Sequence, residues 1–284
     1  MTADVALRLG RVSNLPTVWT NALAGVVLAG GVLGVGEAVR LGIALSLFYV
    51  GGMYLNDAFD HAVDARERPT RPIPSGAVSA RTVYLAGAAM LVLGWTMLGA
   101  VSETRLGPLL GLCLGAAIVY YDWRHKGDPL APVWMGLCRA LVYAAAAAAA
   151  TGAVPGAVVV GALLVLCYVV GLTYAASHET LSAVSKLWPL AGLVAPALVT
   201  APTALHDGPT AVMLVLYAVW CVRAVALLRP RPRADIPGAV VRLIAGISLL
   251  DALLIAAHGR PGVAVVAAAA VPLTRLLQRR VPGT

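Results

Sequence analysis

Apolar stretches of about 18 or more residues recur along this chain from one end to the other. Each is long enough, or nearly long enough, to cross the ~30 Å hydrocarbon core of a bilayer as a helix. Hydrophobic residues make up 60% of the chain and charged residues 12%, against ~25% charged residues in an average soluble domain. This composition excludes a soluble globule and a disordered chain. Membrane β-barrels have strands of alternating polarity, so the sequence predicts an all-α, polytopic membrane protein.

The breaks between the apolar stretches divide the chain into about ten expected spans. These are residues 15–35, 40–59, 80–101, 106–122, 131–151, 154–175, 187–204, 209–228, 237–257 and 261–277. The seventh span, which lies between Pro189 and Pro202, and the tenth are the two that could be broken or interfacial. Nine to ten transmembrane helices are therefore expected. No polar stretch is long enough to bury a core of its own, so residues 1–284 are expected to form a single transmembrane domain.

Basic residues are in excess, and their distribution predicts the topology. The net charge is +8, from 21 lysines and arginines against 13 acidic residues. With a cytoplasmic N-terminus, 16 of the 21 fall on the cytoplasmic side and three, Arg40, Arg105 and Arg260, on the other, as the positive-inside rule requires. We therefore expect a multi-pass protein of the cell (inner or plasma) membrane, surrounded by membrane lipids. Both ends would be inside, and no nucleic-acid partner is expected.

Acidic residues are scarce, yet four of the 13 fall within eleven positions where the second span leaves the membrane: Asp57, Asp60, Asp64 and Glu67. If the helix continues beyond the membrane, the three aspartates recur at i, i+3 and i+7 and share one face. Like charges on one face repel, and a divalent cation removes that penalty. Mg²⁺ is commonly held by one or two carboxylates together with substrate phosphate oxygens.

Arginines follow the acidic run, at Arg66, Arg68 and Arg71. Their guanidinium groups would complement a diphosphate through bidentate hydrogen bonds. Acids beside bases at a membrane exit suit an amphiphile that has a diphosphate head and an apolar tail. From spacing alone, a solvated loop with local ion pairs is an equally good interpretation.

The residues of this run also carry a family resemblance. Asn56, Asp57, Asp60 and Asp64 resemble the NDxxDxxxD motif of the UbiA family of intramembrane prenyltransferases, at the family's usual place. The segment Arg71–Gly76 resembles the RPxPSG sequence that follows that motif. The resemblance implies a helical bundle around a central cavity.

Further roles follow from the same resemblance. The N-terminal segments Arg11–Pro16 and Asn21–Gly25 resemble the family's first helix. The implied ligands of Mg²⁺, and through it of a prenyl diphosphate, are Asp57, Asp60 and Asp64. Asn56 would orient the diphosphate or a ligand carboxylate, and Arg71 would contact phosphate. Arg66 is a substrate-binding candidate from its position after the acidic run alone.

A second segment, Tyr120–Lys126, resembles the family's tyrosine-plus-basic segment at the central cavity. The resemblance implies that Tyr121 and Lys126 bind substrate. For Asp122 we expect an exposed ion pair with Arg124 or Lys126.

Three charged residues fall inside apolar spans. A charge at bilayer depth costs at least ~2.5 kcal/mol, so Arg139 is expected to face the bundle interior with a partner, where it becomes a candidate to bind substrate. Arg242 and Asp251 are nine residues apart in one span and lie on opposite sides of the helix, so they are not expected to pair. Asp251 could line the cavity or form an interhelical hydrogen bond.

The chain departs from the family at a second motif. Members usually carry an aspartate pair, DxxxD, at the cytoplasmic end of the sixth helix. Here the acid in that region is Glu179, with Ala175 and Ala183 four residues to either side, so a second carboxylate pair cannot form. Glu179 is kept as a catalytic candidate and Lys186 as a substrate-binding candidate, although the two could simply share a helix face. The departure resembles divergent branches of the family, including the UbiA-like proteins of Ebo-type operons.

The leading hypothesis is an Mg²⁺-dependent enzyme that transfers a prenyl group from a polyprenyl diphosphate. The acceptor would be a small molecule or a lipid, and is aromatic in many relatives. One alternative keeps the fold but transfers a sugar phosphate to a polyprenyl phosphate. Another is a non-catalytic isoprenoid-binding, lipid-binding or export-linked membrane protein. Release of pyrophosphate separates the enzyme from the binding protein.

Overall fold

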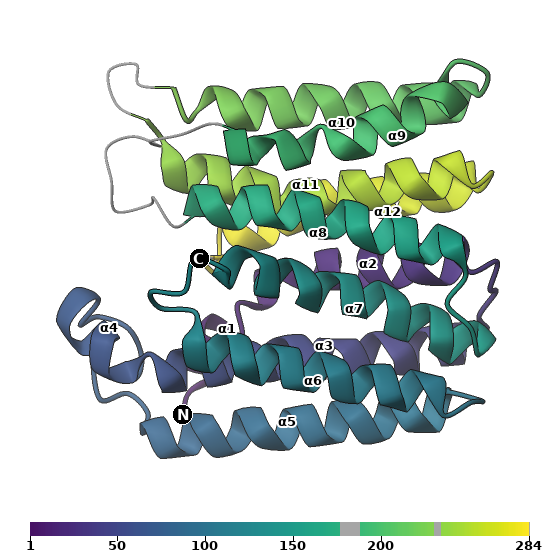
Figure 1. Ribbon diagram of the computed structural model, residues 1–284. Helices are drawn as coiled ribbons and strands as arrows, with labels where there is room; N and C mark the ends of the chain where they lie inside the picture. Colours follow the sequence, from purple (N-terminus) through teal and green to yellow (C-terminus); the bar gives the residue numbers. More distant parts are fainter. Residues whose placement is uncertain (177–187, 230–233, 284) are drawn as a thin grey trace.

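The computed structural model is a bundle of helices and describes residues 1–176, 188–229 and 234–283 (Figure 1). Within these residues, eight helices are long and apolar enough to cross a membrane. The protein is therefore a multi-pass membrane protein with an all-α fold, as the sequence predicts. The α-helices are α1 Ala3–Leu9, α2 Leu15–Leu28, α3 Val35–Phe59, α4 His61–Glu67, α5 Ala80–Val101, α6 Leu106–Arg124, α7 Ala131–Thr151, α8 Gly156–Ala176, α9 Ala195–Ala204, α10 Gly208–Ala226, α11 Ile236–Ala257 and α12 Pro261–Gln278.

Two of the expected spans are shorter than the sequence suggests. The first, α2, has 14 residues and ends before Gly30, whose φ of 73° is left-handed and stops the helix. The seventh is broken into a 3-10 helix, Trp188–Leu193, and the ten-residue α9. Proline has no backbone N–H to donate, and Pro189, Pro196 and Pro202 limit this segment to short pieces. The tenth expected span is the intact helix α12.

Both ends of the chain lie at the same end of the bundle, as an even number of crossings requires (Figure 1). Asn14, which follows α1, donates a hydrogen bond of 2.9 Å to the carbonyl oxygen of Gly283. The short helix α4 lies at this same end (Figure 1). The two termini and α4 therefore share one end of the bundle (Figure 1).

Small residues let the helices approach closely. An added Cβ at Gly51 of α3 would lie 2.9 Å from the carbonyl oxygen of Gly87 in α5, and the reverse distance is the same. Likewise, a Cβ at Gly25 of α2 would overlap the backbone of Tyr143 in α7. Small-residue contacts of this kind stabilise helix pairs in membranes, where apolar burial alone provides little drive. They hold α3 against α5 and α2 against α7.

Candidate active site

A cavity of about 790 Å³ lies at the end of the bundle that carries the termini. Its wall includes residues from α3, α4, the α6–α7 connection, α8 and α11. Polar residues that the sequence singles out contribute to this wall: Asn56, Asp60, Asp64, Arg71, Tyr121, Lys126 and Arg139. The fold therefore brings together side chains that are as far as 83 positions apart in the sequence (56 to 139).

The acidic run does not lie on one continuous helix. The helix α3 ends at Phe59, Asp60 is the residue between, and α4 begins at His61, so the expected single helical face is wrong. The three aspartates are nevertheless all buried, with exposed fractions of 7% for Asp57, 7% for Asp60 and 3% for Asp64. The break sends Asp60 toward one set of cations and Asp57 and Asp64 toward another.

Arg71 joins the two outer aspartates. Its Nη1 lies 2.7 Å from Oδ2 of Asp64 and 3.4 Å from Oδ1 of Asp57. Asp57 also accepts a hydrogen bond of 3.0 Å from Nη2 of Arg11. Arg11 has a left-handed backbone with φ of 42°, a conformation that costs energy in a residue other than glycine. The strain is tolerated where it places the guanidinium against a buried carboxylate, beside the cavity.

Asp60 faces the second set of cations, at the end of α6. Its Oδ2 lies 3.3 Å from Nε2 of His125 and 3.4 Å from Nζ of Lys126. Burial opposes ionisation of Asp60, but the hydrogen bonds and charges of His125 and Lys126 outweigh it, and the pKa of Asp60 is lowered. Burial likewise disfavours the charged form of His125, and contact with Asp60 outweighs it, so the pKa of His125 is raised.

His125 is a site residue that sequence reasoning missed. It stacks on Tyr121, with ring centroids 4.9 Å apart and planes 21° apart. The four-residue spacing from Tyr121 places both rings on one side of the chain, and that spacing is the signal that could have identified it. Lys126, which the sequence predicts at the site, lines the cavity beside it.

The structure contradicts the expectation for Asp122. The residue is not exposed and does not pair with Arg124 or Lys126, because it is 3% exposed and accepts a 3.2 Å hydrogen bond from Nδ2 of Asn56. Helix α6 turns Asp122 toward α3, whereas Arg124, two residues later, lies on the exposed side with its guanidinium 5.2 Å from the ring of Trp123. Lys126 is instead directed to Asp60.

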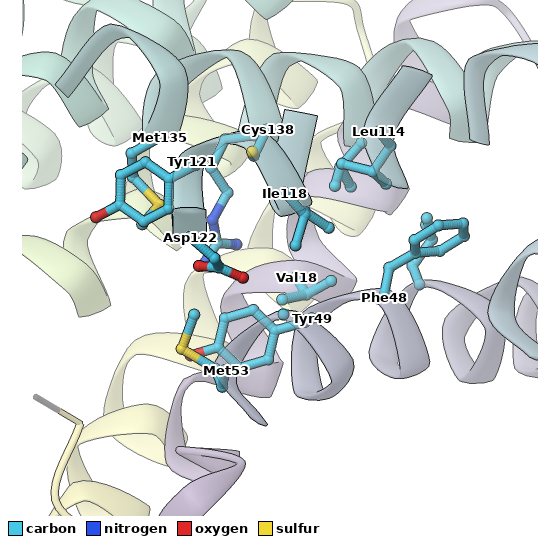
Figure 2. Close-up of a pocket in the computed structure, with 14 residues that line it drawn as sticks. Val18, Phe48, Tyr49, Met53, Leu114, Ile118, Tyr121, Asp122, Met135 and Cys138 are labelled. Carbon is cyan, nitrogen blue, oxygen red and sulfur yellow. The ribbon is translucent and has the colours of Figure 1, made fainter. Parts of the chain in front are cut away.

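A smaller and more apolar pocket of about 70 Å³ adjoins the large cavity. Figure 2 shows its two ends: Phe48, Leu114 and Ile118 lie at one, and Tyr121 and Asp122 at the other. The residues that line both spaces are Tyr49, Met53, Tyr121, Met135 and Arg139. The polar cavity thus continues into an apolar pocket between α2, α3, α6 and α7.

Arg139 lies at the junction of the two spaces and has a partner inside the bundle, as predicted. Its Nη1 donates a 2.9 Å hydrogen bond to Oδ1 of Asn21, and its guanidinium lies 5.5 Å from the ring centre of Tyr49. The amide nitrogen of Asn21 in turn donates to both oxygens of Asp251, at 3.0 and 2.9 Å. Tyr143 also donates to Asp251. Asp251 therefore forms interhelical hydrogen bonds and lines neither space.

The remaining predicted residues are placed differently. Arg66 lies on the exposed side of α4 and is absent from the cavity wall, where Glu67 and Arg68 lie instead. Residues Glu179 and Lys186 fall outside the described residues.

The donor set can be tested against the predicted Mg²⁺. Within the described ranges, no group of three or more histidine, cysteine or acidic side chains is close enough to hold a metal ion by itself. Mg²⁺ requires fewer protein ligands than that, because one or two carboxylates suffice when substrate phosphates complete its coordination shell. Asp60 and Asp64 on the cavity wall supply carboxylate oxygens of the kind Mg²⁺ prefers. The residues fit a metal that is held jointly with a diphosphate, but not a cage built from protein alone.

Comparison with known proteins agrees with this geometry. The sequence model of the UbiA prenyltransferase family matches residues 17–244. A digeranylgeranylglyceryl phosphate synthase of Methanopyrus kandleri is 35% identical over 125 residues, which is 44% of this chain and 45% of that protein. The match thus spans less than half of the relative's length.

Solved structures share the fold. One of a digeranylgeranylglyceryl phosphate synthase aligns with a TM-score of 0.62 and 17% identity, over 93% of this chain and 98% of that one. A UbiA homolog from Archaeoglobus fulgidus bound to GPP and Mg²⁺ aligns with a TM-score of 0.54 and 14% identity, over 96% and 99% of the two chains. At these identities the likeness concerns the arrangement of helices.

Proposed function

Because the chain belongs to the UbiA prenyltransferase family, we propose that it transfers a prenyl group from a prenyl diphosphate to a lipid acceptor inside the membrane. The observation that carries this proposal is the junction of the two spaces. A cavity lined by carboxylates and cations continues into an apolar pocket. A ligand that fits both has a charged head and a hydrocarbon tail, and its reactive carbon lies where the two meet.

The diphosphate would be bound by the cations of the cavity wall. Arg71, His125 and Lys126 already contact buried carboxylates there, and Arg68 lines the same wall. Charge-assisted hydrogen bonds from such groups stabilise the negative charge that develops on departing pyrophosphate.

Asp57, Asp60 and Asp64 are the carboxylates that would hold Mg²⁺ together with the diphosphate. Bound there, Mg²⁺ would supply further neutralisation of the leaving group. The chain's own contribution is to hold the carboxylates in place. Arg71 fixes Asp57 and Asp64, while His125 and Lys126 fix Asp60.

The apolar pocket would receive the reactive end of the prenyl chain. Val18, Leu45, Phe48, Leu114 and Ile118 line it, and such a wall excludes water that would otherwise capture an allylic cation. The prenyl group is thereby kept for the intended acceptor.

The acceptor is proposed to be a glyceryl phosphate that already carries one prenyl chain. The support is the similarity to digeranylgeranylglyceryl phosphate synthases, whose product carries two such chains. Arg139 suits the phosphate of this acceptor. Its guanidinium lies at the junction and donates a hydrogen bond to Asn21, which in turn donates to Asp251. Arg139 therefore does not contact the carboxylate of Asp251 directly.

The orientation and domain organisation are also proposals. The cavity lies at the end of the bundle with both termini, and the distribution of arginines supports a cytoplasmic position for that end. Diphosphate donors made in the cytoplasm would enter from that side. The site draws on residues from Arg11 to Gly283, which supports a single domain over residues 1–284.

The test uses purified protein in detergent or nanodiscs with geranylgeranyl diphosphate, Mg²⁺ and geranylgeranylglyceryl phosphate. We expect release of pyrophosphate and a product heavier by one prenyl group, both abolished by EDTA. Arg71→Ala should lower the rate by about 100-fold or more, because it removes a cation that binds the leaving group. Arg66→Ala is the matched control, since its side chain is exposed and absent from the cavity wall. Tight donor binding without turnover would instead indicate a binding protein.

A further inference from the structure

One oxygen of Asp122 is buried without a hydrogen-bond partner. Among the described residues, Oδ2 of Asp122 contacts no donor, although the side chain is 3% exposed. A buried carboxylate oxygen without a partner costs free energy. Such an arrangement in a membrane-spanning helix indicates a group kept for a ligand.

The unpaired oxygen belongs to a residue that lines the small pocket, beside residues that form the junction with the large cavity. Figure 2 shows the carboxylate of Asp122 directed into the small pocket, which Tyr49 and Met53 also line. Both neighbours line the large cavity as well. Asn56 donates to the other oxygen, Oδ1, and thereby holds the carboxylate in one orientation.

We propose that Asp122 is the general base of the reaction and takes the proton from the hydroxyl group of the acceptor. This role rests on the proposed function. The acceptor oxygen forms a bond to the first carbon of the prenyl group, and the bond from that carbon to the diphosphate breaks. Pyrophosphate leaves with the bonding electrons, and the hydroxyl proton passes to Oδ2 of Asp122. Asp122 then returns the proton to water or to the departing pyrophosphate.

The other buried carboxylates among the described residues are already occupied by cations or by hydrogen bonds. Asp57 and Asp64 contact Arg71, and Asp60 contacts His125 and Lys126. A carboxylate held by a cation is a weaker base, because the positive charge favours its ionised form. Asp122 combines burial, a fixed orientation and a free acceptor oxygen, which are the features that a general base needs.

The role also defines the class of acceptor. An alcohol of the glyceryl type is a poor nucleophile while it keeps its proton, so a base beside it accelerates attack. General-base catalysis typically contributes about 10²–10⁴-fold. We therefore infer that the junction is built for an acceptor with an unactivated hydroxyl group.

The experiment compares Asp122→Asn and Asp122→Ala with the wild type, using geranylgeranyl diphosphate and geranylgeranylglyceryl phosphate. Asp122→Asn keeps the size of the side chain and an oxygen that can accept from Asn56. We expect kcat to fall by about 10²–10⁴-fold, with the Kd for the donor and the melting temperature close to the wild-type values. Asp122→Ala should be equally slow, but added formate should restore part of its rate by supplying a carboxylate in the vacated space. Formate should not rescue Asp122→Asn, where the amide fills that space.

The outcomes separate this role from the proposed function. A wild-type rate in Asp122→Asn, or a loss of donor binding that accounts for its slow turnover, would overturn the role of Asp122 alone. No transfer by the wild type would overturn the proposed function, and this role with it. Should Asp122→Asn fail to fold, Asp122→Ala with formate still decides: rescue supports the base, and a slow folded variant without rescue contradicts it.

Discussion

Asp122 and Asp251 are both buried carboxylates on membrane-spanning helices, and each is bound by an asparagine from another helix. At Asp251, Asn21 donates to both oxygens and Tyr143 adds a further hydrogen bond, and the side chain is 0% exposed. At Asp122, Asn56 donates to one oxygen, and the other has no partner within the described part of the chain. Asp122 lines the small apolar pocket, and Asp251 lines neither that pocket nor the large cavity.

The different hydrogen bonding of Asp251 and Asp122 points to two different roles for a buried carboxylate, one in packing and one in binding a ligand. Asp251 links α11 to α2 and α7, so its hydrogen bonds hold the bundle together. Asn21 also accepts a hydrogen bond from Arg139. The negative charge of Asp251 is therefore close enough to balance the positive charge of Arg139, which the proposed site uses. Asp122 contributes one bond to packing and keeps the other oxygen for a ligand. Substitution by asparagine should therefore have opposite consequences at the two positions.

The largest effect on stability is expected for Asp251→Asn. The amide brings an NH₂ group to Asn21 and Tyr143, which already donate there, and it removes the charge that balances Arg139. Opposing the buried donors of Asn21 and Tyr143 with an amide, and removing the carboxylate charge near Arg139, should together cost about 3 kcal/mol or more. We expect a marked loss of thermal stability in detergent, measured by unfolding of the purified protein. Asp4→Asn is the control, since its carboxylate and that of its partner Arg8 are mostly exposed.

A smaller loss is expected for Tyr143→Phe. This variant removes one hydrogen bond to Asp251 and keeps the ring that fills the core between α2, α7 and α8. A hydrogen bond to a charged group is worth about 1.5–3 kcal/mol. The same unfolding measurement in the double variant with Asp251→Asn should show a loss smaller than the sum of the two. Strict additivity would contradict the view that they form one network.

Gly25→Ala should cost about 1–3 kcal/mol, since an added methyl would overlap the backbone of Tyr143 and push α2 away from α7. The same shift would lengthen the bonds between Asn21 and Asp251. Gly36→Ala, in the first turn of α3, is the matched control, because nothing lies within 4 Å of its added Cβ. Alanine favours a helix there. Equal destabilisation by both variants would show that the contact between α2 and α7 is not the cause.

The contrast between the two aspartates also shows how far the sequence reaches. Hydropathy located the long helices because a bilayer requires continuous apolar runs, and the cost of a buried charge predicted an inward Arg139. Asp122 was misplaced because its neighbours in sequence, Arg124 and Lys126, suggested a local ion pair. Its true partner, Asn56, is 66 residues away on another helix.

The acidic run illustrates the same limit at short range. Spacing predicted that Asp57, Asp60 and Asp64 share one face; in the structure Asp60 and Asp64 line one cavity, and Asp57 is buried beside it against Arg11 and Arg71. Spacing could not show the break at Asp60, which depends on the partners that each carboxylate finds: Arg71 from the following loop and His125 from the end of α6. Contacts between segments that are distant in the sequence decide where the helix breaks and which cation each carboxylate meets. Residue spacing in a single sequence does not predict such contacts.

The smallest effect on stability is expected for Asp122→Asn, the substitution that should be most harmful to turnover. The amide retains an oxygen to accept from Asn56, and it removes a charge whose second oxygen has no partner among the described residues. The cost of burying that charge disappears, so the melting temperature should stay at the wild-type value or rise slightly. The two asparagine variants are measured side by side in one detergent. If Asp122→Asn loses as much stability as Asp251→Asn, then Asp122 is a packing residue like its counterpart, and the distinction between a satisfied and a half-satisfied carboxylate fails for this bundle.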